Sequence, residues 1–248
     1  MQVPHATKFD MISTVIPVFN NESTLAACLS ALIPAAVEGL VREVIVADGG
    51  STDQTMKIAD FSGAETVIGG ATRASRLIAG AAKARFPWLL FLPPDAVLGY
   101  DWTREVEAFI TSSSESKNAS AAAVFRFGID DRGFAPRAIE LATRAGHAVC
   151  GIATSEQGLL ISRSCYTALG GFRQMPLLED LDLVRRIGRS KFTRLRTPLV
   201  SSAQRYRSDG YAARLRHHGL NLLLYGINVP VERIASLRNS PKTGPIGT

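Results

Sequence analysis

Residues 88–97 read "WLLFLPPDAV" and contain a short apolar run that ends in two prolines. The first five residues are all apolar, and an uninterrupted run of this length is typical of a strand that is buried on both faces. Pro93 and Pro94 cannot donate hydrogen bonds to a neighbouring strand, so the strand must end at Leu92. The next side chain is the carboxylate of Asp95. This stretch therefore predicts a buried strand that carries a single acid at its carboxyl end.

Strand and helix patterns alternate through the first half of the chain, which predicts a Rossmann-like α/β fold. Strands are expected at 11–18, 43–48, 65–68 and 88–92, and helices at about 23–32, 51–62 and 71–84. The sequence "STDQ" at 51–54 has the form of a capping box, in which Ser51 and Gln54 bond each other's backbone N–H groups at the start of a helix. We expect a mostly parallel sheet with helices on both faces.

The second half of the chain has a less regular pattern. Strands are expected near 121–127, 158–162 and 192–196, and helices at 101–110, 137–149 and 179–187, with a further short helix that ends at 169–172. The serine-rich stretch 111–120 is expected to form a surface loop.

The composition is that of a globular protein, with 46% hydrophobic and 20% charged residues among 248. No segment reaches the roughly 18 uninterrupted apolar residues of a membrane span, and the first ten residues lack the apolar core of a secretion signal. A cytoplasmic location is therefore expected. Cys28, Cys150 and Cys165 lie far apart without C-x-x-C spacing, which favours small core residues over a zinc site or a disulfide.

The charge is distributed unevenly along the chain. Residues 1–184 hold 15 Lys and Arg against 20 Asp and Glu, a net charge of −5, whereas residues 185–248 hold 13 against 2, a net charge of +11. Such a basic block indicates a nearby polyanion, which is nucleic acid, an anionic membrane surface or phosphate. We expect an α/β domain over residues 1–203 and a basic amphipathic helical extension over residues 204–248.

Polar segments follow each of the first four predicted strands. They are 17–22, 47–53, 69–76 and 93–96. Because ligands of open parallel sheets bind at the carboxyl ends of the strands, we expect these segments to meet at one edge. Helix N-termini there, together with Arg73 and Arg76, favour phosphate, so the edge is expected to hold a nucleotide diphosphate.

Each of these segments also has an ordinary structural interpretation when taken alone. The sequence "DGGSTD" at 48–53 is typical of a tight turn with a helix cap, Asp95 suits a turn, and Arg73 and Arg76 suit a solvated helix face. Glu179 and Asp180, in the first turn of a predicted helix, suit simple stabilisation of that helix. For the loop, Asp95 and the two arginines, it is their joint placement at one edge that favours a site.

Several motifs appear in an order that resembles the family-2 glycosyltransferases of the GT-A fold. These are "STVIPVFNNESTLAACLSAL", "EVIVADGGSTDQT", "WLLFLPPDAVL", "EQGLLISRSCYTALGGF" and "LLEDLDLVRRI", which together span about residues 12–207. The chain is similar in particular to the short bacterial branch labelled selenium-domain-associated glycosyltransferases.

The resemblance implies an inverting transfer of a sugar from a nucleotide-sugar donor to a hydroxyl acceptor. The segment 17–22 and Asp48 match family positions that hold the base and ribose, and Asp95 matches the last acid of a D-x-D type motif that binds Mg²⁺ or Mn²⁺. Of the pair Glu179–Asp180, Asp180 matches the catalytic base. The donor-side residues are Pro17, Val18, Asn20, Glu22, Asp48, Gly49, Arg73, Arg76 and Asp95, and the acceptor-side residues are Gln157, Gly158, Gly171 and Phe172.

These residue types suit the reaction that the resemblance implies. A sugar hydroxyl is a weak nucleophile, so a carboxylate must take its proton during attack on the anomeric carbon, while a cation or arginines stabilise the departing diphosphate. Asp182 lies two residues beyond the base and is expected to be solvated.

The chain departs from the family pattern at two donor-side positions. Relatives commonly have "HAD" or "DAD" where this chain has Pro93-Pro94-Asp95, and often have asparagine in place of Ile78. A non-catalytic relative that binds a nucleotide, sugar or protein partner is therefore an alternative. Nucleotidyl transfer is disfavoured, because "PVFNNE" lacks a Gly-rich, basic phosphate loop.

The basic extension has three interpretations. Residues 205–239 interleave arginines with leucines, which suits docking on anionic lipid that presents a lipid-linked acceptor at the inner face of the cell membrane. The leucines alternatively pack on the domain or on a second subunit in a homodimer. Nucleic acid is not an expected partner, since few aromatics interleave with the basic residues.

Overall fold

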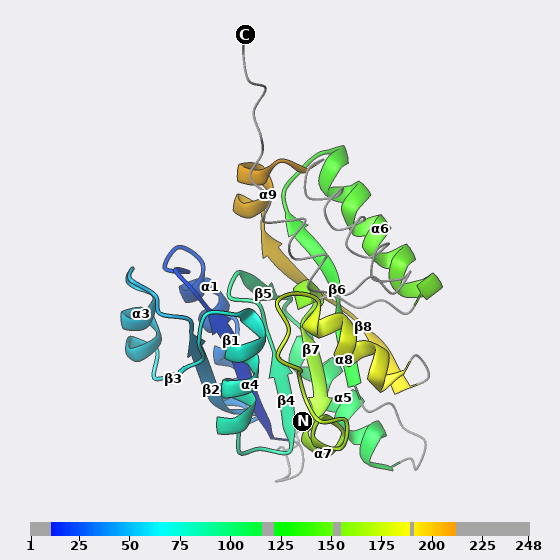
Figure 1. Ribbon diagram of the computed structural model, residues 1–248. Helices are drawn as coiled ribbons and strands as arrows, with labels where there is room; N and C mark the ends of the chain where they lie inside the picture. The colour runs from blue at the N-terminus through cyan, green and yellow to red at the C-terminus, as the bar shows by residue number, and fades with distance from the viewer. Residues whose placement is uncertain (1–10, 116–121, 151–154, 189–190, 212–248) are drawn as a thin grey trace.

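An eight-stranded sheet forms the centre of the protein in the computed structural model, which describes residues 11–115, 122–150, 155–188 and 191–211 (Figure 1). The order of the strands across the sheet is β3-β2-β1-β4-β7-β6-β8-β5. Their bounds are β1 Ile12–Val18, β2 Val41–Asp48, β3 Glu65–Ile68, β4 Trp88–Phe91, β5 Ala96–Leu98, β6 Ala122–Asp130, β7 Leu159–Ser162 and β8 Phe192–Ser202.

Helices cover both faces of the sheet, as predicted (Figure 1). The helices are α1 Leu25–Ser30, α2 Ile33–Val37, α3 Thr55–Phe61, α4 Arg73–Lys83, α5 Trp102–Glu115, α6 Phe134–Cys150, α7 Arg163–Ala168, α8 Glu179–Ile187 and α9 Gln204–Asp209, and residues Ser155–Gln157 form the short 3-10 helix η1. One apolar cluster joins the sheet to α1, α2 and α5, and a second joins it to α4 and α8.

The strand pairing confirms the mostly parallel sheet. β1 is parallel to β2 and β4, β2 is parallel to β3, and β6 is parallel to β8, whereas β7 is antiparallel to both β4 and β6 and β5 is antiparallel to β8. Every residue of β1 and β4 is buried, as the uninterrupted apolar run predicts. The carboxyl ends of β1, β2, β3 and β4 therefore lie along one edge.

Two of the helix boundaries that differ from the sequence prediction are the ends of α1 and α5. The helix expected over 23–32 ends at Ser30, and a second short helix follows with Pro34 in its first turn. α5 continues through the serines to Glu115 instead of ending at Ile110. The hydroxyls of Ser112 and Ser114 donate to the carbonyls of Phe109 and Ile110, at 2.9 and 3.0 Å, which lets these residues remain helical.

The described cysteines and helices bear on two further predictions. Cys28 is a free thiol in the core, as predicted, and Cys165 is a free, half-buried thiol. Within the described ranges, no helix combines the length and apolar character needed to cross a bilayer. The amphipathic stretch expected beyond Tyr211 lies outside the described residues.

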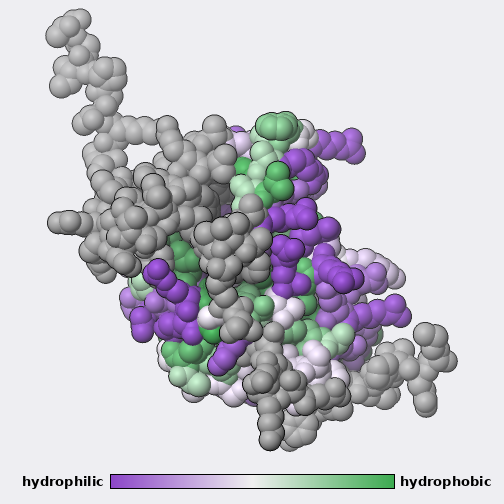
Figure 2. All heavy atoms as spheres, turned by 90° about the vertical axis from the view of Figure 1, so that its right-hand side faces the viewer, coloured by the Kyte–Doolittle hydropathy of each residue, from purple (hydrophilic) through white to green (hydrophobic). Residues whose placement is uncertain are grey.

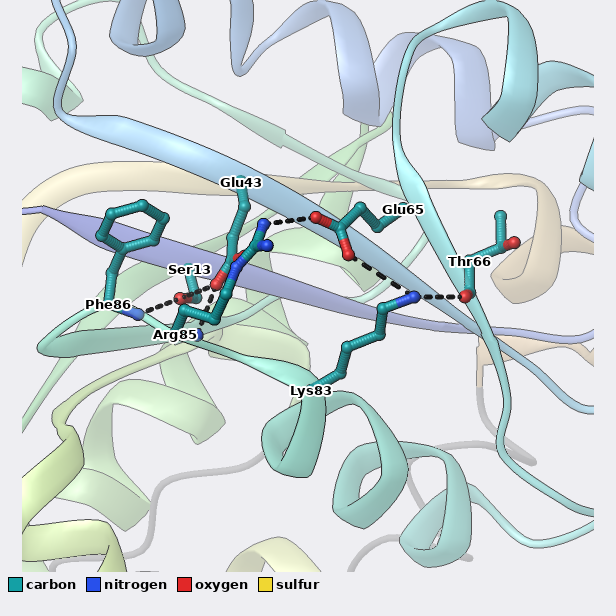
Figure 3. A network of polar contacts seen from close by, with 7 residues as sticks. All are labelled: Ser13, Glu43, Glu65, Thr66, Lys83, Arg85 and Phe86. Atoms are coloured by element: carbon teal, nitrogen blue, oxygen red, sulfur yellow. Dashed lines mark hydrogen bonds and ion pairs between the residues drawn. The ribbon is translucent and has the colours of Figure 1, made fainter.

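A polar network joins the amino-terminal ends of the parallel strands (Figure 3). The Ser13 hydroxyl on β1 donates to Glu43 Oε1 on β2 at 2.5 Å, and the same carboxylate accepts from Arg85 N at 2.6 Å and from Arg85 Nε at 2.8 Å. The Arg85 guanidinium also pairs with Glu65 at the start of β3, and Phe86 N donates to the Ser13 hydroxyl at 3.0 Å. Through Glu43 and Ser13, the residues that lead into β4 are therefore held against β1 and β2.

The charged form of Glu43 is stabilised by these contacts. Burial raises the pKa of Glu43, but hydrogen bonds from Ser13 and Arg85 outweigh burial and hold the pKa below its ordinary value of 4.5. Because the folded-state pKa is depressed, the contribution to stability is present above pH 4.5 and is lost as the pH falls through the folded-state pKa.

Replacing Glu43 with glutamine should lower the free energy of unfolding by about 2 kcal/mol at pH 7, the usual scale for hydrogen bonds to a charged group. The difference from the wild type should shrink as the pH falls below 4.5, measured by urea unfolding at several pH values. Glu38→Gln, at an exposed position, should unfold like the wild type. A Glu43→Gln variant as stable as the wild type at pH 7 would contradict this role.

Candidate active site

Two loops at the carboxyl edge of the sheet are joined by hydrogen bonds between side chains and backbone. Asn20 donates its N–H to the Ser51 hydroxyl at 2.9 Å, and Asn20 Oδ1 accepts from Thr52 N at 2.9 Å. Glu22 Oε2 accepts from Gln54 N at 2.9 Å. Asn20 has a left-handed backbone with φ of 52°, which asparagine tolerates. Asn20 and Glu22 thus shape the edge by holding the loop after β2.

Pro17, Val18 and Asp48 lie side by side where β1 and β2 end. In the parallel register Pro17 is opposite Ala47 and Val18 is opposite Asp48. The Asp48 carboxylate accepts from Gly50 N at 2.9 Å, from Ser51 N at 3.0 Å and from the Ser51 hydroxyl at 2.5 Å. Asp48 is only 7% exposed. Its carboxylate is therefore fixed at the start of the loop.

The predicted capping box at 51–54 is wrong. α3 begins at Thr55, and its N-cap residue, Gln54, makes no capping hydrogen bond with its side chain. Asp53 Oδ1 instead accepts from Thr55 N at 2.9 Å. The reason is that Asp48 and Asn20 bind the Ser51 hydroxyl, so it is not available to the helix.

Arg76 on α4 lies deep within this edge. Two glycines leave room for it: a Cβ at Gly49 would lie 2.3 Å from Arg76 Nη1, and a Cβ at Gly69 would lie 2.5 Å from Arg76 Cα. The guanidinium lies 6.0 Å from the ring centroid of Phe19. Arg76 Nη1 donates to Ala71 O at 3.3 Å. The arginine is thus held in place by the backbone of both loops.

The Arg76 guanidinium has spare hydrogen-bonding capacity. Its Nε is buried and has no hydrogen-bond partner among the described residues. Burial, followed by the nearby charge of Arg73, lowers the pKa of Arg76, while Asp48 and Glu179 act in the opposite direction. A buried donor without a partner is costly, and an anion placed at this edge would satisfy it.

Arg73 joins this edge to a distant part of the chain. It is the first residue of α4, whose N-cap Thr72 accepts from Ser75 N at 3.1 Å. Arg73 Nη1 forms an ion pair with Glu179 Oε1 at 2.6 Å, and the two side chains are 30% and 6% exposed. This pair fixes the N-terminus of α8 beside the N-terminus of α4.

Glu179 and Asp180 open α8 directly after a strained residue. Leu178 has a φ of +63°, which is unusual for a branched residue and costs of the order of 1–3 kcal/mol. Glu179 is buried against Arg73, whereas Asp180 is half-buried and its Oδ1 accepts from Leu181 N at 2.8 Å. Asp180 is therefore the more accessible of the two acids.

The prediction that Asp182 is solvated is wrong. Asp182 is 8% exposed and pairs with Arg186 at 2.6 Å and with Arg173 at 3.2 Å. Arg186 also donates to the carbonyls of Leu169 and Gly171, at 2.5 and 2.7 Å. The loop before α8 folds over this side of the helix, so Asp182 anchors α8. The four-residue spacing of Asp182 and Arg186 is the sequence signal for this pair.

Asp95 occupies the turn between β4 and β5 and is 6% exposed. Its carbonyl accepts from Ser202 N, at the end of β8, at 3.1 Å. Burial and the charge of Asp95 together raise the pKa of the Cys28 thiol to about 12. Asp95 thus lies between α1 and β8, on the part of the edge next to β1. β5, which follows it, was not predicted because it has only three residues.

The predicted acceptor-side residues lie at two places. Leu159 pairs with Phe91, so Gly158 and Gln157 are level with the carboxyl end of β4. Gln157 is 1% exposed and Gly158 has a φ of +65°. Phe172 packs on Phe91 with ring centroids 4.9 Å apart, and it follows Gly171 in the loop anchored by Arg186. Gln157 and Phe172 are therefore buried supports of the edge.

The described residues offer few metal ligands. They contain no group of three or more His, Cys, Asp or Glu side chains arranged to hold a metal ion. Asp95 supplies one hard carboxylate. A divalent cation that prefers oxygen can be held by one or two carboxylates when substrate phosphates and water complete its shell, so the chemistry of Asp95 fits such an ion.

Sequence reasoning missed several residues that support this edge. Phe19 lies beneath the Arg76 guanidinium, Thr72 caps α4, and Arg173 and Arg186 hold α8. Thr72 could have been found, because a threonine just before a helical pattern is an N-cap signal. Phe19 and Arg173 carried no comparable signal, because their partners are distant in the sequence.

Known proteins resemble this chain in sequence and in structure. Residues 13–139 match the family described as glycosyl transferase family 2. Glucosyl-3-phosphoglycerate synthases from Mycobacterium tuberculosis and Mycobacterium bovis are each 46% identical over 56 residues, which are 23% of this chain and 17% of the relative. The match thus spans less than a fifth of the length of these curated relatives.

Solved structures of the glucosyl-3-phosphoglycerate synthase from M. tuberculosis share the fold. Its complex with phosphoglyceric acid superposes with a TM-score of 0.59 at 21% identity and covers 89% of this chain and 81% of that one. Its complex with Mn²⁺, UDP and glucosyl-3-phosphoglycerate gives 0.58 at 19% identity and covers 93% and 87%. This likeness confirms the predicted GT-A fold. Because the family match extends over half of the sequence, this chain belongs to glycosyl transferase family 2.

Proposed function

We propose that the protein transfers a sugar from a nucleotide-sugar donor to an acceptor hydroxyl, with inversion at the anomeric carbon. The observation that carries the proposal is the Arg76 guanidinium, which is built into the carboxyl edge and has a buried Nε without a partner among the described residues. The diphosphate of a nucleotide sugar has the charge and the acceptor oxygens that this group lacks.

Several features support binding of the donor at this edge. Arg73 and the N-terminus of α4 lie near Arg76, so a second arginine and the positive end of a helix are close to the proposed phosphate position. The ring of Phe19 is 52% exposed and offers an apolar surface next to Arg76. The loops that contain Asn20, Glu22 and Asp48 are held rigidly by their mutual hydrogen bonds. They are proposed to receive the base and ribose.

The proposal includes a divalent cation, Mg²⁺ or Mn²⁺, with Asp95 as its protein ligand. Bound there, the cation would stabilise negative charge on the diphosphate. Arg76 provides positive charge at the same edge from the protein itself, and Arg73 lies beside it in an ion pair with Glu179. Since Asp95 is a single carboxylate, affinity for the metal should depend on the bound nucleotide diphosphate.

Asp180 is proposed as the catalytic base. Its half-buried carboxylate would accept the proton of the acceptor hydroxyl while the hydroxyl oxygen forms a bond to the anomeric carbon. The bond from that carbon to the diphosphate oxygen breaks, and the nucleoside diphosphate leaves with the electron pair. Glu179 is proposed as a positioning residue, because its carboxylate is already paired with Arg73.

The basic extension is proposed to act on the acceptor side. Of residues 204–248, the structure describes 204–211, where α9 packs on the domain through Tyr206, which is 3% exposed. We propose that the rest of the basic stretch 205–239 contacts an anionic membrane surface at the inner face of the cell membrane, with a second copy of the chain as the alternative partner. Salt-sensitive flotation with anionic liposomes would support the membrane contact, and its absence would end that part of the proposal.

Replacing Arg76 with glutamine should weaken binding of the preferred nucleoside diphosphate by about 10-fold or more, because a charge-assisted hydrogen bond is lost. Isothermal titration with UDP, GDP, ADP and CDP measures this effect, after a thermal-shift panel identifies the preferred base. Arg42→Gln removes the same charge from an exposed position on β2 and should bind like the wild type. Equal affinities of the Arg76→Gln variant and the wild type would refute the proposed donor site.

Replacing Asp180 with asparagine should lower the rate of sugar transfer by about 100-fold or more, because the proton acceptor is removed. Affinity for the nucleoside diphosphate should stay within about twofold, since Asp180 is not proposed to bind the donor. Asp60→Asn, at an exposed position on α3, is the matched control. If the wild type binds the donor but neither hydrolyses nor transfers its sugar, the non-catalytic alternative replaces the proposal.

A further inference from the structure

A groove of about 1020 Å³ lies over the outer part of the sheet and is lined by residues other than those of the candidate site. Its floor is formed by β6 and β8, and its sides by α6, the loop before α6, and α9. The lining contains five arginines and three acids, namely Arg126, Arg132, Arg137, Arg144, Arg207, Asp130, Asp131 and Glu140. We call this feature the arginine groove.

The alternation of residues along β6 explains why the groove is open. Ala122 and Val124 point to the face that α8 covers, and both are buried. Arg126, the next residue on that face, is exposed, as is Asp130 four residues further on, with the half-buried Gly128 between them. Residues on the opposite face, such as Phe127 and Ile129, remain buried. The sheet thus continues past α8 and presents a polar floor.

Two of the five arginines in the arginine groove are already paired. Arg207 forms a two-point contact with Asp131, at 2.9 and 2.7 Å, and Arg137 contacts both oxygens of Glu140, at 2.7 and 2.6 Å. Arg126, Arg132 and Arg144 have no ion pair within the part of the chain that the structure describes.

The unpaired charges leave the arginine groove positive. Asp130 is the one acid of its lining that has no ion pair among the described residues, whereas three of its arginines have none. Figure 2, which looks toward the side of the molecule formed by α6 and α8, shows hydrophilic residues gathered along that side. An anion is therefore the complementary ligand.

The arginine groove is connected to the carboxyl edge by two hydrogen bonds. Ser202, which lines the groove at the end of β8, donates its N–H to the carbonyl of Asp95 at 3.1 Å. Tyr206 on α9 donates its hydroxyl to Glu156 Oε2 at 2.7 Å, and Glu156 precedes Gln157 in η1. The groove therefore borders the part of the edge that carries Asp95 and Gln157.

We propose that the arginine groove binds the acceptor of the transfer through a phosphate or carboxylate group that the acceptor carries beside its reacting hydroxyl. This inference rests on the proposed function and names the class of its second substrate, a compound that carries an acidic group in addition to the reacting hydroxyl. The planar guanidinium of arginine suits both phosphate and carboxylate, since it forms two parallel hydrogen bonds with either. The acidic group binds in the groove and the hydroxyl extends toward the donor.

The phosphate of such an acceptor has two possible sources, a free small molecule or a lipid headgroup. The lining favours either over nucleic acid, because the acids on its walls repel an extended phosphate backbone and its floor aromatic, Phe127, is buried and cannot stack on bases. The groove volume is that of a small-molecule site. The two sources are separated by the choice of probe.

The test uses the full chain, three variants of the groove and one control. Arg126→Gln and Arg144→Gln each remove one unpaired guanidinium. Gly128→Val places a side chain on the floor without a change of charge, and the nearest atom to the added Cβ, Val200 Cγ2, is at an ordinary 3.5 Å. Arg104→Gln removes an exposed charge from α5, on the other face of the sheet. Thermal unfolding of each variant checks that it folds.

Binding is measured by titration with inorganic phosphate, glycerol 3-phosphate and glycerol. The wild type should bind the two phosphates and not glycerol. The two arginine variants should bind them about 10-fold more weakly because a charge-assisted contact is lost, and Gly128→Val should also weaken binding because its side chain occupies the floor, while Arg104→Gln matches the wild type. In transfer assays the groove variants should raise KM for glycerol 3-phosphate about 10-fold with KM for the donor unchanged. Flotation with phosphatidylglycerol vesicles, competed by free phosphate, would identify a lipid headgroup as the source.

Each outcome decides for or against the arginine groove. Absence of phosphate binding in the wild type, or equal binding in the wild type and all three groove variants, overturns the inference and leaves donor binding at Arg76 untouched. Equal transfer to glycerol and to glycerol 3-phosphate also overturns it while preserving the proposed function. Phosphate binding in the groove without any binding of a nucleotide sugar would refute the acceptor role together with the proposed function.

Discussion

The ion pair between Arg73 and Glu179 is the contact on which the arrangement of the candidate site depends. It joins residues 106 positions apart and brings the N-termini of two helices together at the carboxyl edge of the sheet. Because Glu179 is nearly buried, its charge needs this partner, and removing either one leaves an unpaired charge in a partly dehydrated place. The pair therefore sets where α8 begins, and with it the position of Asp180 relative to Arg76. The Asp182–Arg186 pair fixes the same helix from its other side.

The two edges of the parallel strands have different tasks. At the amino-terminal edge, the carboxylate of Glu43 is fully used by Ser13 and Arg85, so this network is closed and serves stability. At the carboxyl-terminal edge, the side-chain oxygens of Asp48, Asn20 and Glu22 also accept hydrogen bonds from the protein. The Nε of Arg76, however, is a buried donor without a partner among the described residues. The spare donor of Arg76, a charged group, distinguishes the carboxyl-terminal edge from the closed Glu43 network.

Much of the fold and part of the site were predictable from local patterns. The uninterrupted apolar run before Pro93 gave β4 within one residue, and the acids with the apolar periodicity of 179–187 gave α8 with the observed bounds. Partners distant in sequence were not predictable. Asn20, which donates its N–H to the Ser51 hydroxyl from 31 residues away, and Arg173, which pairs with Asp182 from the loop before α8, are contacts that no local pattern specifies. The arginine groove depends on β8 continuing beside β6 to Ser202, whereas the sequence pattern ended that strand at Arg196.

A double-mutant cycle on Arg73 and Glu179 tests the central claim most directly. Transfer rates from the nucleotide sugar would be measured for the wild type, Arg73→Gln, Glu179→Gln and the double variant. If the pair positions α8, the double variant should be no slower than the slower single variant, which corresponds to a coupling free energy of about 1–3 kcal/mol. Additive losses, with a coupling near zero, would show that the two side chains act independently and would contradict the account.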